Sequence, residues 1–213
     1  MYRLLYRMRQ SEMMILLLLF TILLLLVNYY PAVTLWDSAF IVFIQSKLNA
    51  MPVSIPLLPD CRLYTIMIIL PLITGCVYFF RKNLYFNILL LCSTPLTAFI
   101  LNCIVKNIVK RERPPIELHL CVHPESYGFV SSHSLVTFCL YGIVIFFIRK
   151  YSKNKILKNF ITVVSVLWIL FVGLSRIWLG VHYPTDVLGA YILGSILLLC
   201  YINIFYKLGA GKE

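Results

Sequence analysis

Long apolar stretches recur along the chain and are separated by short polar segments. Six of them approach the roughly 20 residues that a helix needs to cross a bilayer, at about residues 13–30, 63–80, 84–105, 130–148, 160–179 and 187–205. The pattern predicts an all-α polytopic membrane protein with six transmembrane helices in one bundle. No Gly/Ser-rich linker or internal repeat divides the sequence, so we expect residues 1–213 to form a single membrane-embedded domain.

A further helix is predicted between the first two apolar stretches. Residues 36–51 place apolar side chains such as Trp36 and Phe40 against polar ones such as Asp37 and Gln45 at helical spacing. This spacing fits an amphipathic helix that lies in the outer membrane interface. Two interpretations remain open for it, a structural cover for the bundle and a lip over a slot through which lipid enters.

Composition and charge support the membrane assignment and suggest an orientation. The chain has 61% hydrophobic and 13% charged residues and a mean hydropathy of +0.90, whereas soluble domains carry roughly 25% charged residues. With the N-terminus inside, the inner face carries 12 of the 19 Lys and Arg residues, and its net charge is +10 of the total +11. Basic residues favour the cytoplasmic side. The uneven distribution of Lys and Arg therefore predicts cytoplasmic termini. Because this distribution accounts for the net positive charge, we predict no nucleic-acid partner.

On this topology the segments 31–62, 106–129 and 176–185 face outward together. The last of them holds Arg176 and His182, and Asp186 follows it, between two apolar stretches where charge is costly. If Tyr183 begins a helix, His182 and Asp186 stand at i and i+4 on one face, where the carboxylate can orient the imidazole. An oriented histidine beside a guanidinium suits attack on an oxyanion such as a phosphate.

Basic residues also follow the third stretch. Lys106 and Arg113 are two helical turns apart and can point to one side if the helix continues as far as Arg113, where Pro114 disfavours helical geometry. Lys110 and Arg111 are interpreted as an ordinary basic cluster beside the membrane.

Polar residues precede the fourth stretch. Ser131 is placed to cap that helix, whose first N–H groups would be free to bind an anion. His133 would project from its first turn.

The outer loops also contain residue types that bind metals or form disulfides. His119, Cys121 and His123 alternate onto one face of an extended loop, and imidazole and thiolate suit zinc or copper. A disulfide between Cys61 and Cys121 is a separate possibility. No fourth metal ligand is evident, so we predict no metal site and no cofactor.

Taken in order, these residues resemble the three-part signature of the type 2 phosphatidic acid phosphatase family. The three parts are a lysine, six residues and Arg-Pro at 106–114, Ser-x-His at 131–133, and Ser-Arg, five residues, His, three residues and Asp at 175–186. The sequence of residues 127–133, Tyr-Gly-Phe-Val-Ser-Ser-His, is similar to that of small bacterial members known as undecaprenyl-diphosphatases or lipid phosphatases. The family shares its anion pocket with vanadium haloperoxidases.

The resemblance implies a role for each motif residue. His182 would attack phosphorus and form a phosphohistidine, with Asp186 fixing its tautomer, and His133 would protonate the leaving oxygen and later activate water. The phosphate would be held by Lys106, Arg113, Ser131, Ser132 and Arg176. These cations would replace a metal, so no cofactor is implied. The site would face outward from a bacterial inner membrane.

Two residues depart from the family pattern, which has Pro-Ser-Gly-His where this chain has Val130-Ser131-Ser132-His133. The changes remove a preset helix start and add a Cβ near the phosphate. The expected activity is hydrolysis of undecaprenyl diphosphate, a phospholipid phosphate or lipid A phosphate, with membrane lipids as further partners. A lipid phosphotransferase and a non-catalytic transporter or scaffold remain alternatives.

Overall fold

The computed structural model describes residues 2–49, 61–120 and 125–209, and every regular element in these ranges is helical. Six of the helices are long and apolar enough to cross a membrane. They are α1 (Tyr2–Tyr29), α3 (Cys61–Arg81), α4 (Tyr85–Val109), α5 (Ser132–Tyr151), α6 (Lys155–Trp178) and α7 (Pro184–Ile204). A further helix, α2 (Pro31–Asn49), follows α1, and two short elements are η1 (Ile116–Leu118) and the π-helical η2 (Phe205–Gly209). The predicted class is confirmed.

Several helices extend beyond the apolar stretches that predicted them. Helix α6 begins at Lys155 rather than near residue 160, because the side-chain oxygen of Asn154 caps it by accepting hydrogen bonds from the amides of Ile156 and Leu157 at 2.9 and 3.1 Å. Helix α4 continues through Lys106 to Val109. These two helices therefore extend past the apolar stretches that predicted them.

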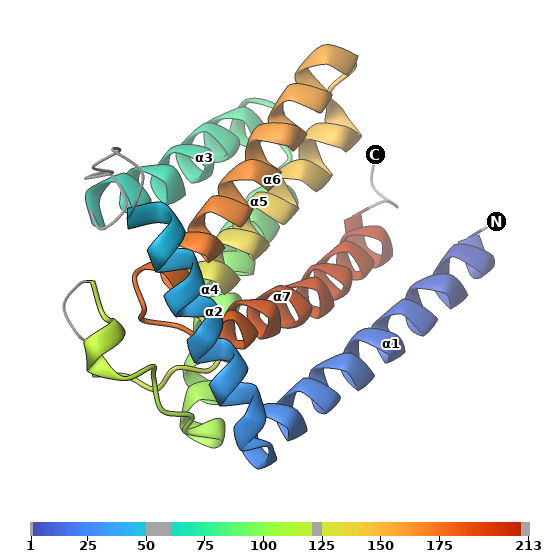
Figure 1. Cartoon of the computed structure of the whole chain (residues 1–213). Helices are drawn as coiled ribbons and strands as arrows, with labels where there is room; N and C mark the ends of the chain where they lie inside the picture. The colour runs from blue at the N-terminus through green and yellow to red at the C-terminus, as the bar shows by residue number, and fades with distance from the viewer. Residues whose placement is uncertain (1, 50–60, 121–124, 210–213) are drawn as a thin grey trace.

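Helix α5 occupies the centre of the bundle. It packs against α4, α6 and α7, while α1 packs along α7 (Figure 1). One buried cluster includes Leu140, Ile143 and Phe147 of α5, and a second includes Phe129, Leu135 and Ala190. The ends of α4 and α6 and the beginnings of α5 and α7 consequently meet at one end of the bundle.

Helix α2 crosses that end of the bundle (Figure 1). It contacts α1, α6 and α7, and Ile41 is fully buried in a cluster with residues of α6 and α7. Asp37 is also buried, whereas Trp36 is 78% exposed. The predicted amphipathic helix is present, and it turns polar groups toward the protein because it lies over polar loops. Its contacts fit a cover for the bundle.

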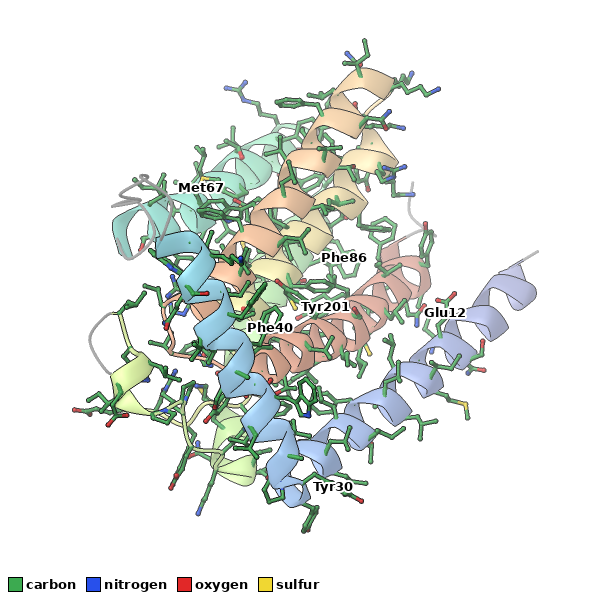
Figure 2. All side chains as sticks on the ribbon, in the orientation of Figure 1. Glu12, Tyr30, Phe40, Met67, Phe86 and Tyr201 are labelled. Atoms are coloured by element: carbon green, nitrogen blue, oxygen red, sulfur yellow. The ribbon has the colours of Figure 1, made fainter. Side chains whose placement is uncertain are left out.

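Apolar side chains dominate the outer surface of the helices, as Figure 2 shows for the sticks along the transmembrane segments. Examples such as Leu70, Phe99 and Leu167 are more than half exposed. This surface is suited to contact with lipid.

Gly189 lets α7 approach the segment that precedes α5. A Cβ at this position would lie 2.7 Å from Cε2 of Phe129 and 3.0 Å from Cγ1 of Val130. Phe129 and Val130 are fully buried. Small residues commonly permit such close contacts between membrane helices.

We expect Gly189→Val to lower the free energy of unfolding by about 1–3 kcal/mol, because a side chain forced into a packed interface causes strain. Thermal unfolding in detergent measures the effect. The control is Leu188→Val at the adjacent position, which is 51% exposed. Equal melting temperatures for the two variants would contradict the close packing of α7.

Candidate active site

The start of α7 brings a histidine and a carboxylate together. Tyr183 is the N-cap and Pro184 the first helical residue, so Asp186 lies in the first turn. One carboxylate oxygen of Asp186, Oδ2, accepts a hydrogen bond from the amide of Tyr183 at 3.0 Å and lies 3.4 Å from Nδ1 of His182. His182 is 3% exposed and Asp186 is not exposed. The helix start thus fixes the carboxylate beside the imidazole.

The other ring nitrogen of His182 faces a guanidinium. Nη1 of Arg113 lies 3.2 Å from Nε2 of His182 and donates to the carbonyl oxygen of Val181 at 2.6 Å. The remaining nitrogens of Arg113 donate to Ser126, from Nε to its carbonyl oxygen and from Nη2 to its hydroxyl. A guanidinium only donates, so Nε2 must offer its lone pair and Nδ1 must carry the proton, toward Asp186.

Burial controls the protonation of His182. Loss of hydration lowers the pKa of His182 to about 4, against the opposing effect of Asp186, and Arg113 and Lys106 lower it further. The imidazole is therefore neutral at pH 7. A buried neutral imidazole with one oriented lone pair is competent as a nucleophile.

Lys106 reaches the same region from the last turn of α4. Its side chain is buried, and Nζ donates a hydrogen bond to the carbonyl oxygen of Tyr127. The condition that the helix continues as far as Arg113 is not met, because α4 ends at Val109 and Lys110 adopts a left-handed conformation with φ of 50°. The loop, rather than the helix face, brings Arg113 to the site.

The segment before α5 is held by hydrogen bonds to two other helices. Ser131 is the N-cap residue of α5, but its side chain makes no cap hydrogen bond and instead accepts from the hydroxyl of Ser134 at 3.0 Å. The amide of Ser131 donates to the carbonyl oxygen of Asp186 at 3.2 Å. Ser131 is fully buried, as are Ser134 and Asp186, to which it is hydrogen-bonded.

Val130 and Ser132, the two residues that depart from the family pattern, both make contacts that hold the start of α5. The hydroxyl of Ser132 donates to the side-chain oxygen of Asn102 at 2.6 Å, and the Asn102 amide donates to the carbonyl oxygen of Val130 at 2.9 Å. The side chain of Val130 is buried among apolar residues. Asn102 therefore ties α4 to the start of α5, and Ser132 extends that tie.

His133 and Arg176 complete the group of residues that the sequence singled out. The His133 ring lies 4.5 Å from the Tyr64 ring, centroid to centroid, and is within electrostatic range of Arg176, His182, Arg113 and Lys106. Arg176 lies in the last turn of α6, and its Nε donates to the Ser175 hydroxyl at 3.2 Å. Four separate helices and two loops thus contribute to one cluster.

Two residues of this cluster were not identified from the sequence. Arg111, interpreted as part of a basic surface cluster, is 8% exposed and donates to Oδ1 of Asp186 at 2.5 Å and to Oδ2 of Asp37 at 2.8 Å. The surface interpretation of Arg111 is wrong, because buried carboxylates on two other elements draw its side chain inward. The one available signal was Asp37 itself, an isolated acid in an apolar helix.

The suggested metal and disulfide residues fall largely outside the described part of the chain. Cys121 and His123 lie in the segment 121–124, and the side chain of Cys61 is also not described. Nε2 of His119 lies 3.0 Å from the carbonyl oxygen of Pro114. Among the described residues, no group of His, Cys, Asp and Glu could hold a metal ion.

Comparison with known proteins identifies the family. Residues 87–210 match the PAP2 superfamily. Phosphatidylglycerophosphatase B of Bacillus subtilis is 36% identical over 135 residues, which are 61% of this chain and 64% of that protein. A crystal structure described as the first transmembrane PAP2 type phosphatidylglycerolphosphate phosphatase from Bacillus subtilis superposes with a TM-score of 0.77, at 27% identity, over 92% of this chain and 96% of the other.

The family match spans the segments that supply Lys106, Arg113, His133, His182 and Asp186. The similar solved structure covers the transmembrane bundle as well. This chain is a member of the PAP2 superfamily.

Proposed function

We propose that the protein hydrolyses a lipid phosphate or diphosphate through a phosphohistidine on His182. The observation that carries the proposal is the geometry of this imidazole, whose Nε2 lies 3.2 Å from Arg113 while its Nδ1 lies 3.4 Å from Asp186. A phosphate that replaces Nε2 as an acceptor of Nη1 of Arg113 frees the lone pair of Nε2 and places its phosphorus in front of it. A transporter or scaffold would not require this arrangement.

In the first step, Nε2 of His182 attacks phosphorus and the bond from phosphorus to the leaving oxygen breaks. His133, which carries a proton once the anionic phosphate offsets the nearby cations, gives that proton to the leaving oxygen, so the lipid leaves as an alcohol or a monophosphate. Asp186 stabilises the positive charge that develops on the imidazole. Proton transfer of this kind contributes about 10²- to 10⁴-fold to a rate.

In the second step, His133 takes a proton from water and the resulting hydroxide attacks phosphorus. The bond between nitrogen and phosphorus breaks, which releases inorganic phosphate and regenerates neutral His182. Lys106, Arg113 and Arg176 stabilise the negative charge on the phosphoryl oxygens in both steps. Preorganised donors of this kind are worth roughly 3–4 kcal/mol each.

An apolar slot beside His133 supports a lipid substrate. This cavity of about 450 Å³ lies between α3, α4 and α5, and its lining includes Tyr64, Leu96, Phe99, Ser132 and His133. Leu96 and Phe99 are more than half exposed on the lipid-facing surface. We infer that acyl or isoprenoid chains enter from the bilayer through the slot while the phosphate binds at the cations.

The substrate and the facing of the site are part of the proposal. The similarity to phosphatidylglycerophosphatase B favours a glycerophospholipid phosphate, and undecaprenyl diphosphate and lipid A phosphate fit the same chemistry. The excess of basic residues at the opposite end of the bundle favours a site on the outer side of a bacterial inner membrane.

His182→Ala should abolish phosphate release, because it removes the imidazole nitrogen that lies 3.2 Å from Arg113 and would attack phosphorus. Purified protein is assayed with phosphatidylglycerophosphate, phosphatidic acid, undecaprenyl diphosphate and lipid A, with and without an acceptor lipid. The control is His119→Ala in the outer loop, which should retain activity. Unchanged turnover in the His182 variant would reject the mechanism. A phosphotransferase is indicated if the wild-type protein releases free phosphate without the acceptor lipid but not with it.

Leu96→Trp should block the slot and lower the turnover of long-chain substrates, while a short-chain, water-soluble phosphate is hydrolysed as before. The matched control is Leu89→Trp on the same helix, where the side chain is exposed and outside the slot. Kinetics with a chain-length series measures the effect. Equal losses for short and long chains would contradict the role of the slot.

Acidification should destabilise the protein through His182. Its pKa is about 4 in the folded protein and about 6.5 when unfolded, so protons favour the unfolded chain. The free energy of unfolding should therefore fall as pH decreases from about 6.5 to about 4. Thermal unfolding of wild type and His182→Gln is compared over this range, and an unchanging difference between their melting temperatures would contradict the buried neutral imidazole.

A further inference from the structure

A buried chain of charges continues behind the proposed nucleophile. Arg111, from the loop after α4, binds Asp37 of α2 at 2.8 Å and Asp186 of α7 at 2.5 Å. Asp37, Arg111 and Asp186 are 4%, 8% and 0% exposed. We call these three residues the acid–arginine bridge. It joins three elements that are far apart in the sequence and ends at the carboxylate beside His182.

Each oxygen of Asp186 has a separate partner. Oδ1 accepts from Nη1 of Arg111, whereas Oδ2 accepts from the amide of Tyr183 and faces Nδ1 of His182. The Arg111 guanidinium lies over the Tyr183 ring at 4.4 Å, which restricts its rotation. With both oxygens assigned, the carboxylate cannot turn without breaking a buried hydrogen bond.

Asp37 holds the other side of Arg111 and also the start of α7. Its Oδ1 accepts from the amide of Thr185 at 3.2 Å, and its Oδ2 accepts from the Thr185 hydroxyl. Nη1 of Arg111 donates to the same hydroxyl at 2.8 Å. A carboxylate at a helix N-terminus interacts favourably with the helix dipole. Asp37 therefore fixes both the guanidinium and the turn that carries Asp186.

A merely structural tie would not need these buried charges. Helix α2 is already held by Gln45, whose Nε2 donates to the carbonyl oxygens of Leu118 and Trp178 at 2.8 and 2.9 Å, and by the buried side chain of Ile41. Buried ion pairs are often no more stabilising than apolar residues of similar size. Their position against Asp186 indicates a role in controlling that carboxylate.

We propose that Asp37 and Arg111 are positioning residues for the reaction, which keep Asp186 ionised and oriented so that His182 presents its lone pair at Nε2. The proposal rests on the proposed function of His182. Arg113, Lys106 and His133 also act electrostatically on His182. None of these three belongs to the acid–arginine bridge, so the bridge can be varied while they remain in place.

The test uses charge-changing variants of the bridge in the full-length protein. Wild type has two carboxylates and one guanidinium, with one net negative charge. Arg111→Gln leaves two negative charges, Asp37→Asn leaves none, and the double variant restores one. NMR of ¹⁵N-histidine-labelled protein reports the tautomer and the pKa of His182 in each, and kcat and KM are measured in parallel.

We expect Arg111→Gln to raise the pKa of His182, to mix its tautomers, and to lower kcat by about 10²-fold with little change in KM, as for a displacement of about 1 Å. Asp37→Asn should leave that pKa at or below the wild-type value, with a smaller loss of kcat. The double variant should return the pKa to near the wild-type value, while kcat remains low because the orientation is not restored.

Gln45→Ala is the control, because it removes a tie of α2 without touching the bridge. It should lower the melting temperature and leave the tautomer and kcat unchanged. If Arg111→Gln does not fold, a loss of kcat in Asp37→Asn but not in Gln45→Ala supports the proposal, and equal kcat in these two variants overturns it. Identical tautomers, pKa values and kcat in all folded bridge variants would overturn the proposal. Activity in His182→Ala would instead reject the proposed function itself.

Discussion

The site depends on the buried carboxylate of Asp186, which lies beside His182 at the start of α7. This carboxylate binds the amide that begins its own helix, faces the imidazole, and pairs with Arg111. Burying such a charge is costly unless it is paired and fully hydrogen-bonded. Helix α7 packs against α5, and the loop after α4 and helix α2 lie beside them. Together these elements supply the partners of the carboxylate. One ionised group can therefore remain where water is excluded.

The membrane explains why the polar residues collect at one end of the bundle. Helices that cross hydrocarbon satisfy their own backbone groups and present apolar side chains to lipid, so charges are confined to helix ends and loops. Lys106, Arg113 and Arg176 come from such positions. The same end opens into the slot beside His133. Under the proposed function, a phosphate with a long apolar tail meets the cations without leaving the bilayer.

Much of the fold and most of the candidate site could be predicted from the sequence, because both depend on local patterns. Apolar length gave the six crossings, and motif spacing pointed to His133 and His182. Burial that depends on distant partners could not be predicted this way. Arg111 is 74 residues from Asp37 and 75 from Asp186, and only the folded chain shows that it joins them.

The end of α4 and the role of α2 could not be decided from the sequence either. Helix α4 ends at Val109 because Lys110 turns the chain in a left-handed conformation, which residue types alone did not indicate.

Rapid-quench labelling with a lipid diphosphate that carries ³²P in its terminal phosphate tests the phosphohistidine on His182 most directly, with mass spectrometry to locate the label. We expect an acid-labile phosphoryl group on His182, which accumulates in His133→Ala. Label on another residue, or none on His182 while that variant still releases phosphate, would contradict the account.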